Sequence, residues 1–130
     1  MPYHFEFDSD HRILLVVLEG DVDGDQMQRA NAELQPHKSR LQPSAVITDA
    51  STVTTFDVSS QTVRDLAKRS SHPPAPPTPG YLVAPSDHLF GMGRMFQILA
   101  NRDQVHVVRS RDEALDALGA HNASFQRLEA

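Results

Sequence analysis

The 130-residue chain contains no cysteine. This absence excludes disulfide bonds, thiolate chemistry and zinc sites with cysteine ligands, and it suits a reducing compartment. The first ten residues, MPYHFEFDSD, have neither the basic region nor the apolar region of a signal peptide. The longest apolar run, residues 13–18, is far shorter than the roughly 20 residues that a membrane-spanning helix needs. We therefore expect a cytoplasmic protein that does not insert into a membrane.

Basic residues are also scarce. Twelve lysines and arginines stand against 17 aspartates and glutamates, so the net charge is −5, and the basic residues form no cluster. Nucleic-acid-binding domains usually carry a basic patch, so we expect no nucleic-acid partner. Hydrophobic residues make up 39% of the chain, which is enough for one modest core. The length predicts a single domain over residues 1–130, with a core over about residues 3–119 and a polar tail over residues 120–130.

Hydrophobic runs predict five β-strands. Residues 3–7 alternate between apolar and polar side chains, as in a half-buried strand, and residues 13–18 are continuously apolar, as in a central strand. Turn-forming residues between these two strands predict an antiparallel hairpin. Three further short strands are predicted over residues 45–48, 81–84 and 105–108. The polar residues that follow the second and third strands are predicted to form a loop, at residues 20–25, and a turn, after residue 48.

The first two predicted helices begin at polar capping residues. The first helix follows Asp23 or Asp25, either of which is a suitable N-cap, and Pro36 interrupts or kinks it. The second helix opens at the pair Ser59 and Ser60, directly after the predicted turn.

The two remaining predicted helices follow the fourth and fifth strands. The third helix covers residues 89–99, and the fourth begins with a capping box in which Ser110 is the N-cap and Glu113 lies three residues later. Residues 70–80 hold five prolines in eleven positions and are predicted to be an extended loop. The predicted order is ββαβαβαβα, which indicates an α/β fold with a mixed, mostly parallel sheet covered by helices.

One stretch of the chain resembles a known family. A hydrophobic strand ends in Asp49-x-Ser, a short turn follows, and DVSS at residues 57–60 opens a helix. This pattern resembles the STAS domain, the anti-sigma-factor-antagonist (SpoIIAA-like) fold, in which the helix opens with Asp-Ser-Ser-Gly. Val58 and Ser60 stand where that family usually has Ser or Thr and Gly. Residues 81–96 are similar to bacterial single-domain STAS/SEC14-like proteins, and the resemblance as a whole implies an STAS-like fold.

The resemblance also implies a function. It indicates a non-enzymatic regulatory or protein-interaction module whose partner is an anti-sigma-type kinase or a related signalling protein. The phosphoacceptor position of the family falls on Ser59, and Ser60 is the neighbouring candidate. A serine before a helix is also an ordinary N-cap, so both interpretations stay open. The partner-docking surface implied by the resemblance contains Asp49, Asp57, Val58 and Val63.

The third predicted helix contains the unusual run FGMGRMF at residues 90–96. One interpretation is a helix packed on the sheet, with glycines that permit close approach. The alternative is an adaptable apolar surface, because methionine fills irregular spaces. Such a surface would bind a small hydrophobic or lipid-like ligand, or would form a homodimer with a purely structural role. Its candidate residues are Phe90, Met92, Arg94, Met95 and Phe96.

Recognisable catalytic and metal-binding patterns are missing from the sequence. None of the seven histidines has a second histidine four residues away, so we predict no metal site. The adjacent residues Ser86, Asp87 and His88 do not lie in a Gly-x-Ser-x-Gly motif, and neighbours in sequence seldom form a triad. The pair Gly91-x-Gly93 lies inside a predicted helix and lacks the third glycine of a dinucleotide fingerprint. We therefore expect no enzyme activity and no cofactor.

Overall fold

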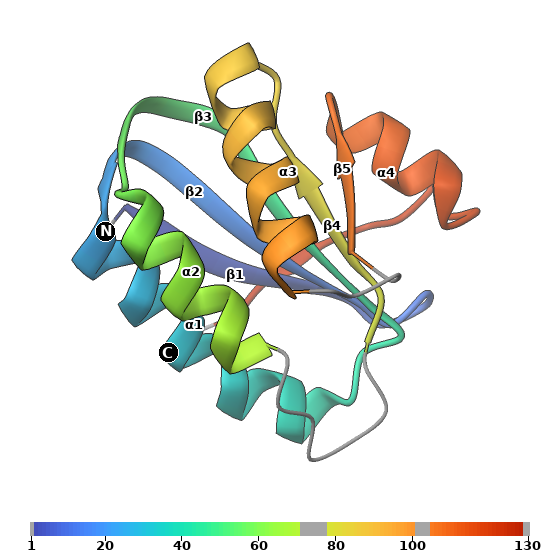
Figure 1. Ribbon diagram of the computed structural model, residues 1–130. Coiled ribbons are helices and arrows are strands. Elements are labelled where there is room, and N and C mark those ends of the chain that lie inside the picture. The colour runs from blue at the N-terminus through green and yellow to red at the C-terminus, as the bar shows by residue number, and fades with distance from the viewer. Residues whose placement is uncertain (1, 71–77, 101–104, 129–130) are drawn as a thin grey trace.

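The computed structural model of the chain describes residues 2–70, 78–100 and 105–128. These residues form an α/β fold in which one mixed sheet is covered by helices on both faces (Figure 1). The predicted α/β class and the mixed sheet are therefore confirmed. Most of the predicted proline-rich loop, residues 71–77, lies outside the described residues.

The sheet has six strands in the order β5-β4-β3-β2-β1-β6. Neighbours β2, β3, β4 and β5 pair in parallel, whereas β1 pairs antiparallel with β2 and with β6. The predicted hairpin of the first two strands is confirmed, with Tyr3 opposite Leu18 and Asp8 opposite Ile13. The strands are β1 (Tyr3–Asp8), β2 (Ile13–Asp23), β3 (Ala45–Asp57), β4 (Gly80–Val83), β5 (Val105–Val108) and β6 (Gln126–Arg127).

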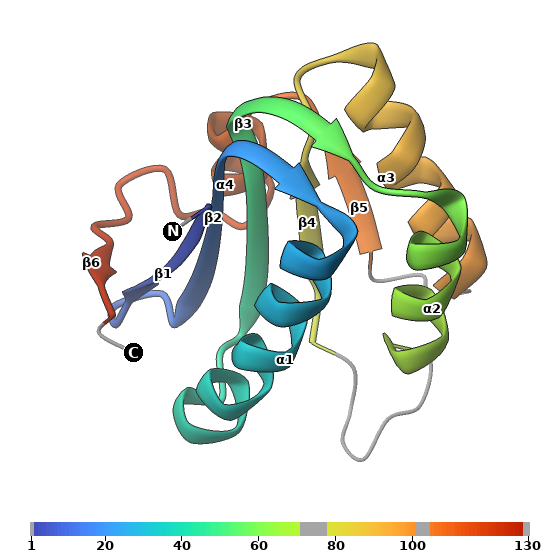
Figure 2. The same cartoon turned by 90° about the vertical axis from the view of Figure 1, so that its left-hand side faces the viewer.

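Four helices connect the strands and cover the two faces of the sheet. Helices α1, α2 and α3 lie on one face and α4 lies on the other (Figures 1 and 2). Alternate residues of the central strands point to opposite faces, so Leu14 and Val16 pack toward α1 and α3, and Ile13 and Leu15 pack toward α4. The helices are α1 (Gly24–Leu41), α2 (Ser60–Ser70), α3 (Asp87–Ala100) and α4 (Arg111–Ala117).

Strands β2 and β3 are much longer than the sequence indicates. The predicted loop at residues 20–25 and the predicted turn after residue 48 are wrong, because both segments remain in the sheet as far as Asp23 and Asp57. The polar side chains there form cross-strand bonds: the Thr52 hydroxyl donates to the carbonyl of Leu18 at 2.9 Å. The pairing shifts register beside Gly20, whose φ of +66° belongs to the left-handed region that glycine adopts easily.

Helix α1 continues through Pro36, so an interruption, one of the two predicted effects of this proline, is wrong, and a kink, the other, stays a prediction. The proline cannot donate the helical N–H bond to the carbonyl of Ala32, and both residues are exposed. Asp23 is the N-cap, as one of the two predicted alternatives, and it forms a full capping box with Gln26. The cap contributes about 1 kcal/mol, which offsets only part of the roughly 3 kcal/mol that an interior proline costs.

The capping box predicted for α4 forms only in half. The N–H of Glu113 donates to the Ser110 hydroxyl at 3.1 Å, as expected for an N-cap. The Glu113 carboxylate, however, accepts from the N–H of Arg109 at 3.1 Å instead of returning to the N–H of Ser110.

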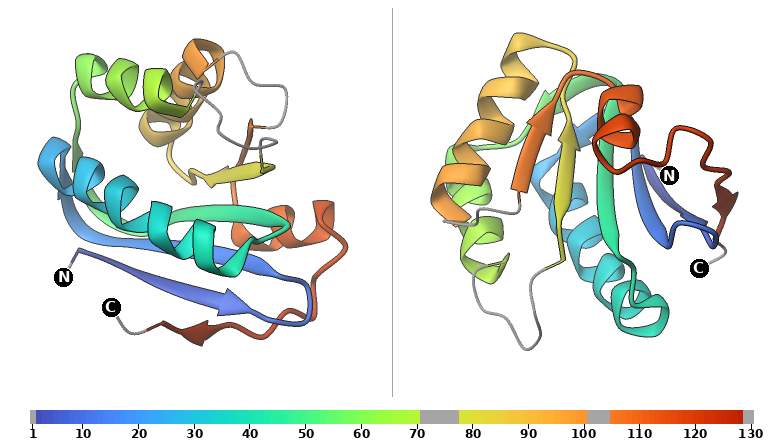
Figure 3. Two further views of the ribbon diagram at one scale, coloured as in Figure 1. Left: turned by 90° about the horizontal axis from the view of Figure 1, so that it is seen from below. Right: turned by 90° about the vertical axis from the view of Figure 1, so that its right-hand side faces the viewer.

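The C-terminal residues add a strand that the sequence analysis did not predict. Residues Gln126–Arg127 form β6 on the outer side of β1, and the N–H of Leu128 donates to the carbonyl of Phe5 at 2.8 Å. Figure 3 shows this segment alongside β1 at the edge of the sheet. Phe125 and Leu128 pack against the two opposite cores, and β1 and β6 pair at this edge of the sheet.

Candidate functional site

The most prominent feature of the described residues is a cavity of about 1010 Å³ between the sheet and helices α1, α2 and α3. Protein interiors are packed as densely as organic crystals and seldom leave voids larger than a water molecule. Ligand pockets measure roughly 300–1,000 Å³, so this space has the size of a ligand pocket. The cavity is therefore the candidate functional site.

The floor of the cavity follows from the alternation of the central strands. Val16 and Leu18 on β2, with Val46, Thr48 and Ala50 on β3, point to the face that carries α1 and α3. Four of these five side chains are apolar, and Thr48 supplies a hydroxyl in the middle. Leu82 and Ala84 continue the floor in and just after β4.

The wall formed by α3 contains part of the surface that the sequence singles out. Met92, Gly93 and Phe96 line the cavity. A Cβ atom on Gly93 would lie 3.1 Å from Cγ1 of Val107, so the glycine lets α3 approach β5 closely. Two of the five candidate residues of this helix, Met92 and Phe96, therefore face the cavity.

The other three candidates of this helix lie elsewhere. Phe90 packs against the core, and the guanidinium carbon of Arg109 lies 4.1 Å from its ring centre. Arg94 is exposed, and Met95 is half-buried and does not line the cavity. Among the described residues, the large apolar side chains that are truly exposed are Ile98 and Leu99, near the end of α3.

The cavity differs in character between its two ends. At the carboxyl end of the parallel strands the lining is wholly apolar and mostly buried; it consists of Met27, Ala50, Phe56, Val58, Ala84 and Leu89. At the opposite end the lining contains Gln35, Lys38, Ser39, Gln42 and Thr78. Gln35, Ser39 and Gln42 are exposed.

The sequence did not predict that α1, α2 and the extended part of β3 line this cavity. Its only advance signal is the small size of the residues on the inner face of α1, where Ala30 and Asn31 stand between Met27 and Leu34. Small side chains there leave room between the helix and the sheet, whereas larger ones would fill it.

Ser59 lies exposed at the junction of β3 and α2, where it acts as a helix cap. Its hydroxyl accepts from the N–H of Thr62 at 3.1 Å and lies 3.1 Å from the Thr62 hydroxyl. Ser60 is also exposed and is the first residue of α2. The capping interpretation therefore accounts for the geometry of Ser59.

The four residues of the implied docking surface do not share one exposed face. Val58 and Val63 are buried and line the cavity, and Asp49 is buried near α4. Asp57, at the end of β3, is exposed.

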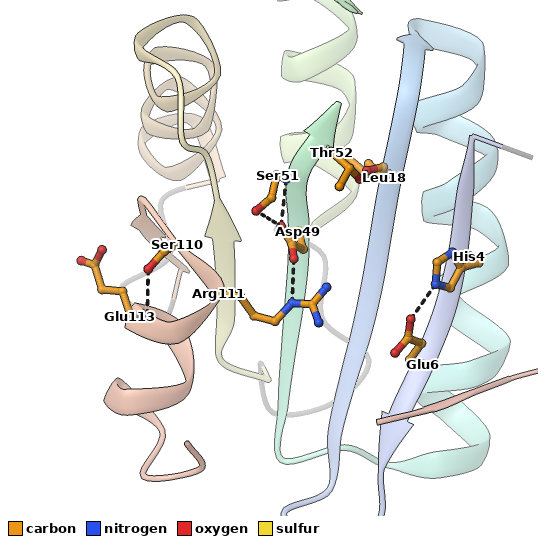
Figure 4. Close-up of polar contacts among 9 residues, drawn as sticks. All are labelled: His4, Glu6, Leu18, Asp49, Ser51, Thr52, Ser110, Arg111 and Glu113. Carbon is orange, nitrogen blue, oxygen red and sulfur yellow. Dashed lines mark hydrogen bonds and ion pairs between the residues drawn. The ribbon is translucent and has the colours of Figure 1, made fainter. Parts of the chain in front are cut away.

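The buried carboxylate of Asp49 forms an ion pair with the half-exposed guanidinium of Arg111 on the α4 side of the sheet. One carboxylate oxygen accepts from Nε of Arg111 at 2.7 Å, and the other accepts from the N–H of Ser51 at 2.9 Å and from the Ser51 hydroxyl (Figure 4). A buried carboxylate is tolerated only when its oxygens are satisfied in this way. The arrangement fastens α4 to β3.

Three titratable groups outside the cavity have shifted pKa values among the described residues: the pKa of Tyr3 is raised, chiefly by its hydrogen bond to Glu33, and those of His37 and Asp8 are lowered. Burial lowers the pKa of His37 and the charge of Arg40 lowers it further, while Glu33 opposes both. Burial alone would raise the pKa of the Asp8 carboxyl, but the hydrogen bonds that it accepts from His11 and from the backbone outweigh burial and lower the pKa. The His11 ring lies 2.7 Å from this carboxylate, at the turn between β1 and β2.

Within residues 2–70, 78–100 and 105–128, no group of three or more His, Asp or Glu side chains is placed to hold a metal ion. In the same part of the chain, no helix has the length and apolar character needed to cross a membrane. A scan against protein-family models finds no match to the chain, and a comparison with the curated proteins finds no relative.

Proposed function

We propose that the protein binds an apolar small molecule in the cavity between the sheet and helices α1, α2 and α3. The observation that carries the proposal is the cavity itself, with a volume of about 1010 Å³ and a mainly apolar lining. Such a space without an occupant costs stability, because its lining forfeits dispersion contacts and the hydrophobic gain of filling. A ligand that fills it therefore gains free energy from burial of its apolar surface.

The test uses the uncharged dye N-phenyl-1-naphthylamine, whose fluorescence rises in apolar surroundings. We expect saturable binding to the wild-type protein and much weaker binding to Ala50→Leu, because Ala50 is buried on the cavity floor. Ala117→Leu is the control, since Ala117 is exposed on α4, across the sheet from the cavity. Equal dye binding by all three proteins, each shown to be folded by circular dichroism, would refute the proposal.

We propose as a second function the regulatory module of STAS type that the sequence implies, with an STAS-like topology and an anti-sigma-type kinase as partner. The exposure of Ser59 at the N-terminus of α2 favours it, because the helix dipole stabilises a phosphate there. Phosphate on Ser59 would add roughly two negative charges beside exposed Asp57 and would repel an acidic partner surface.

The second proposal is tested by the intact mass of protein purified from its own cells, before and after phosphatase. We expect phosphatase to lower the mass of the wild type by about 80 Da, the mass of one phosphoryl group, and to leave the mass of Ser59→Ala unchanged. A chain that carries no phosphate under any growth condition, with Ser59 serving only as the cap of α2, would contradict it.

A further inference from the structure

Thr48 is a polar residue in the middle of the apolar floor of the cavity. Its neighbours across the sheet are Val16 on β2 and Leu82 on β4. Its neighbours on the same face of β3 are Val46 and Ala50. All four neighbours are apolar, and all four line the cavity together with Thr48. The hydroxyl group of Thr48 is therefore surrounded by apolar side chains on the surface of the sheet.

This hydroxyl group has no hydrogen-bond partner within residues 2–70, 78–100 and 105–128. The next threonine on the strand differs, because the Thr52 hydroxyl donates to the carbonyl of Leu18 at 2.9 Å. A hydroxyl group in apolar surroundings costs free energy unless it is hydrogen-bonded, and valine, which is also β-branched, would fit the floor without that cost. Half-buried Thr48 thus brings to the cavity a hydrogen-bonding group that the described part of the chain does not use.

The described lining offers no unpaired charge to a ligand. None of the described lining residues is Asp or Glu, although the chain has 17 acidic residues. The charged residue among them, Lys38, already has an interaction partner in the protein. A charge that is buried without a counter-charge is costly, so these walls favour an uncharged ligand.

The position of Thr48 indicates where the polar group of such a ligand would lie. Val46 and Ala50 are two residues before and after Thr48 on β3, so the apolar floor extends by about 7 Å along the strand on each side of it. A ligand whose polar group reaches Thr48 therefore has apolar surface to cover on both sides of that group.

We infer that the ligand is an uncharged, largely apolar molecule with a hydroxyl or carbonyl group between two apolar parts, and that this group hydrogen-bonds to the Thr48 hydroxyl. A threonine hydroxyl can donate to a carbonyl oxygen and can donate to or accept from a hydroxyl group. The inference rests on the proposed binding function and adds the polarity of the ligand and the residue that recognises it.

The experiment compares three uncharged probes with the same carbon skeleton: diphenylmethanol, benzophenone and diphenylmethane. In each probe a central carbon joins two phenyl rings, and this carbon carries a hydroxyl group, a carbonyl oxygen or no oxygen. Equilibrium dialysis, with the probes measured by chromatography, gives the dissociation constants for wild type, Thr48→Val and Thr55→Val. Thr55→Val is the matched control, because Thr55 is exposed on β3 and does not line the cavity.

Thr48→Val keeps a β-branched side chain and removes the hydroxyl group. We expect it to weaken the binding of diphenylmethanol, of benzophenone or of both by about three- to tenfold, the usual effect of one neutral hydrogen bond. Diphenylmethane has no hydrogen-bonding group, so its dissociation constant should be unchanged. Thr55→Val should bind all three probes as the wild type does. A loss for diphenylmethanol alone assigns a hydroxyl group to the ligand, and a loss for benzophenone alone assigns a carbonyl group.

Urea unfolding of the free proteins provides a second readout. Because the Thr48 hydroxyl is unpaired, Thr48→Val should be at least as stable as the wild type. A clearly less stable Thr48→Val would mean that the hydroxyl group has a partner inside the protein, and would overturn the inference.

The binding results separate the inference from the proposed function. Unchanged dissociation constants in Thr48→Val, or an equal loss for all three probes, would overturn the inference while the binding function stands. The same holds if N-phenyl-1-naphthylamine binds and neither oxygen-bearing probe does. Absence of binding by the dye and by all three probes would overturn both.

Discussion

The two glycines of α3 offer a direct test of how this helix is seated on the sheet. A Cβ atom on Gly91 would meet no atom within 4 Å, whereas one on Gly93 would lie 3.1 Å and 3.4 Å from the two methyl carbons of Val107. Replacing a glycine by alanine in an exposed helix interior stabilises the helix by about 0.8–1.0 kcal/mol. Gly91→Ala should therefore stabilise the protein by about this amount.

Gly93→Ala has the same helical gain but adds a methyl group to a contact that is already tight. Overpacking of this kind typically costs about 1–3 kcal/mol, so the net effect of Gly93→Ala is neutral to destabilising. We expect the free energies of unfolding of the two variants to differ by at least about 1 kcal/mol. For a chain of this length the difference corresponds to roughly 4 °C in melting temperature.

Urea unfolding followed by circular dichroism measures both variants under identical conditions. The Val107→Ala background provides the control, because removal of the two methyl groups should restore the full gain of Gly93→Ala. Equal stabilisation by Gly91→Ala and Gly93→Ala in the original background would refute the close approach of α3 to β5. It would also place the α3 wall of the cavity further from the sheet than the 3.1 Å contact at Val107 implies.

Three further predictions concern the polar contacts outside the cavity. Arg111→Met leaves the buried carboxylate of Asp49 without its cation and should destabilise the protein by about 2–4 kcal/mol in urea unfolding, and adding Asp49→Asn should recover part of the loss. The pKa of His37 is lowered in the folded protein, so as the pH falls the unfolded chain takes up a proton on His37 before the folded protein does. The free energy of unfolding should therefore be highest above about pH 6.5 and should fall as the pH drops below that value. His37→Phe should reduce this pH dependence in urea unfolding curves recorded at several pH values. The pKa of Asp8 is lowered in the folded protein, so its ionised carboxylate stabilises the fold above about pH 3.8 and this stabilisation is lost below that pH. Asp8→Asn should therefore be less stable than wild type at pH 6 and should lose less stability as the pH is lowered further. A steeper loss of stability in acid for the variant would contradict the contact with His11.

Local patterns in the sequence were sufficient to predict those strands and helices that depend on side chains close together in the chain. The alternation at residues 3–7 and the apolar run at residues 13–18 predict β1 and the first part of β2, and Ser110 marks the start of α4. These features depend on side chains a few positions apart, so the sequence contains them directly.

Elements held by distant partners were not predictable in the same way. The polar residues after residue 48 favour a turn by composition, yet Thr52 bonds to Leu18, which is 34 positions away. Strand β6 consists of two residues and exists because β1, at the other end of the chain, pairs with it. The cavity was still harder to predict from the sequence, because it depends on the sizes of side chains from three helices and four strands at once.

The long strands and the cavity have a common origin. Because β2 continues to Asp23 and β3 to Asp57, α1 and α2 begin beyond the end of β4, which stops at Val83. In Figure 2 the ends of β2 and β3 bend over toward the helices, and α2 starts well away from the face of the sheet. Phe56 and Val58, on and just after the extended part of β3, then close the apolar end of the space that this displacement leaves. A short turn after residue 48 would bring α2 down onto the sheet and fill that space. The segment whose composition predicts a turn is instead a strand, and this strand gives the candidate site its shape.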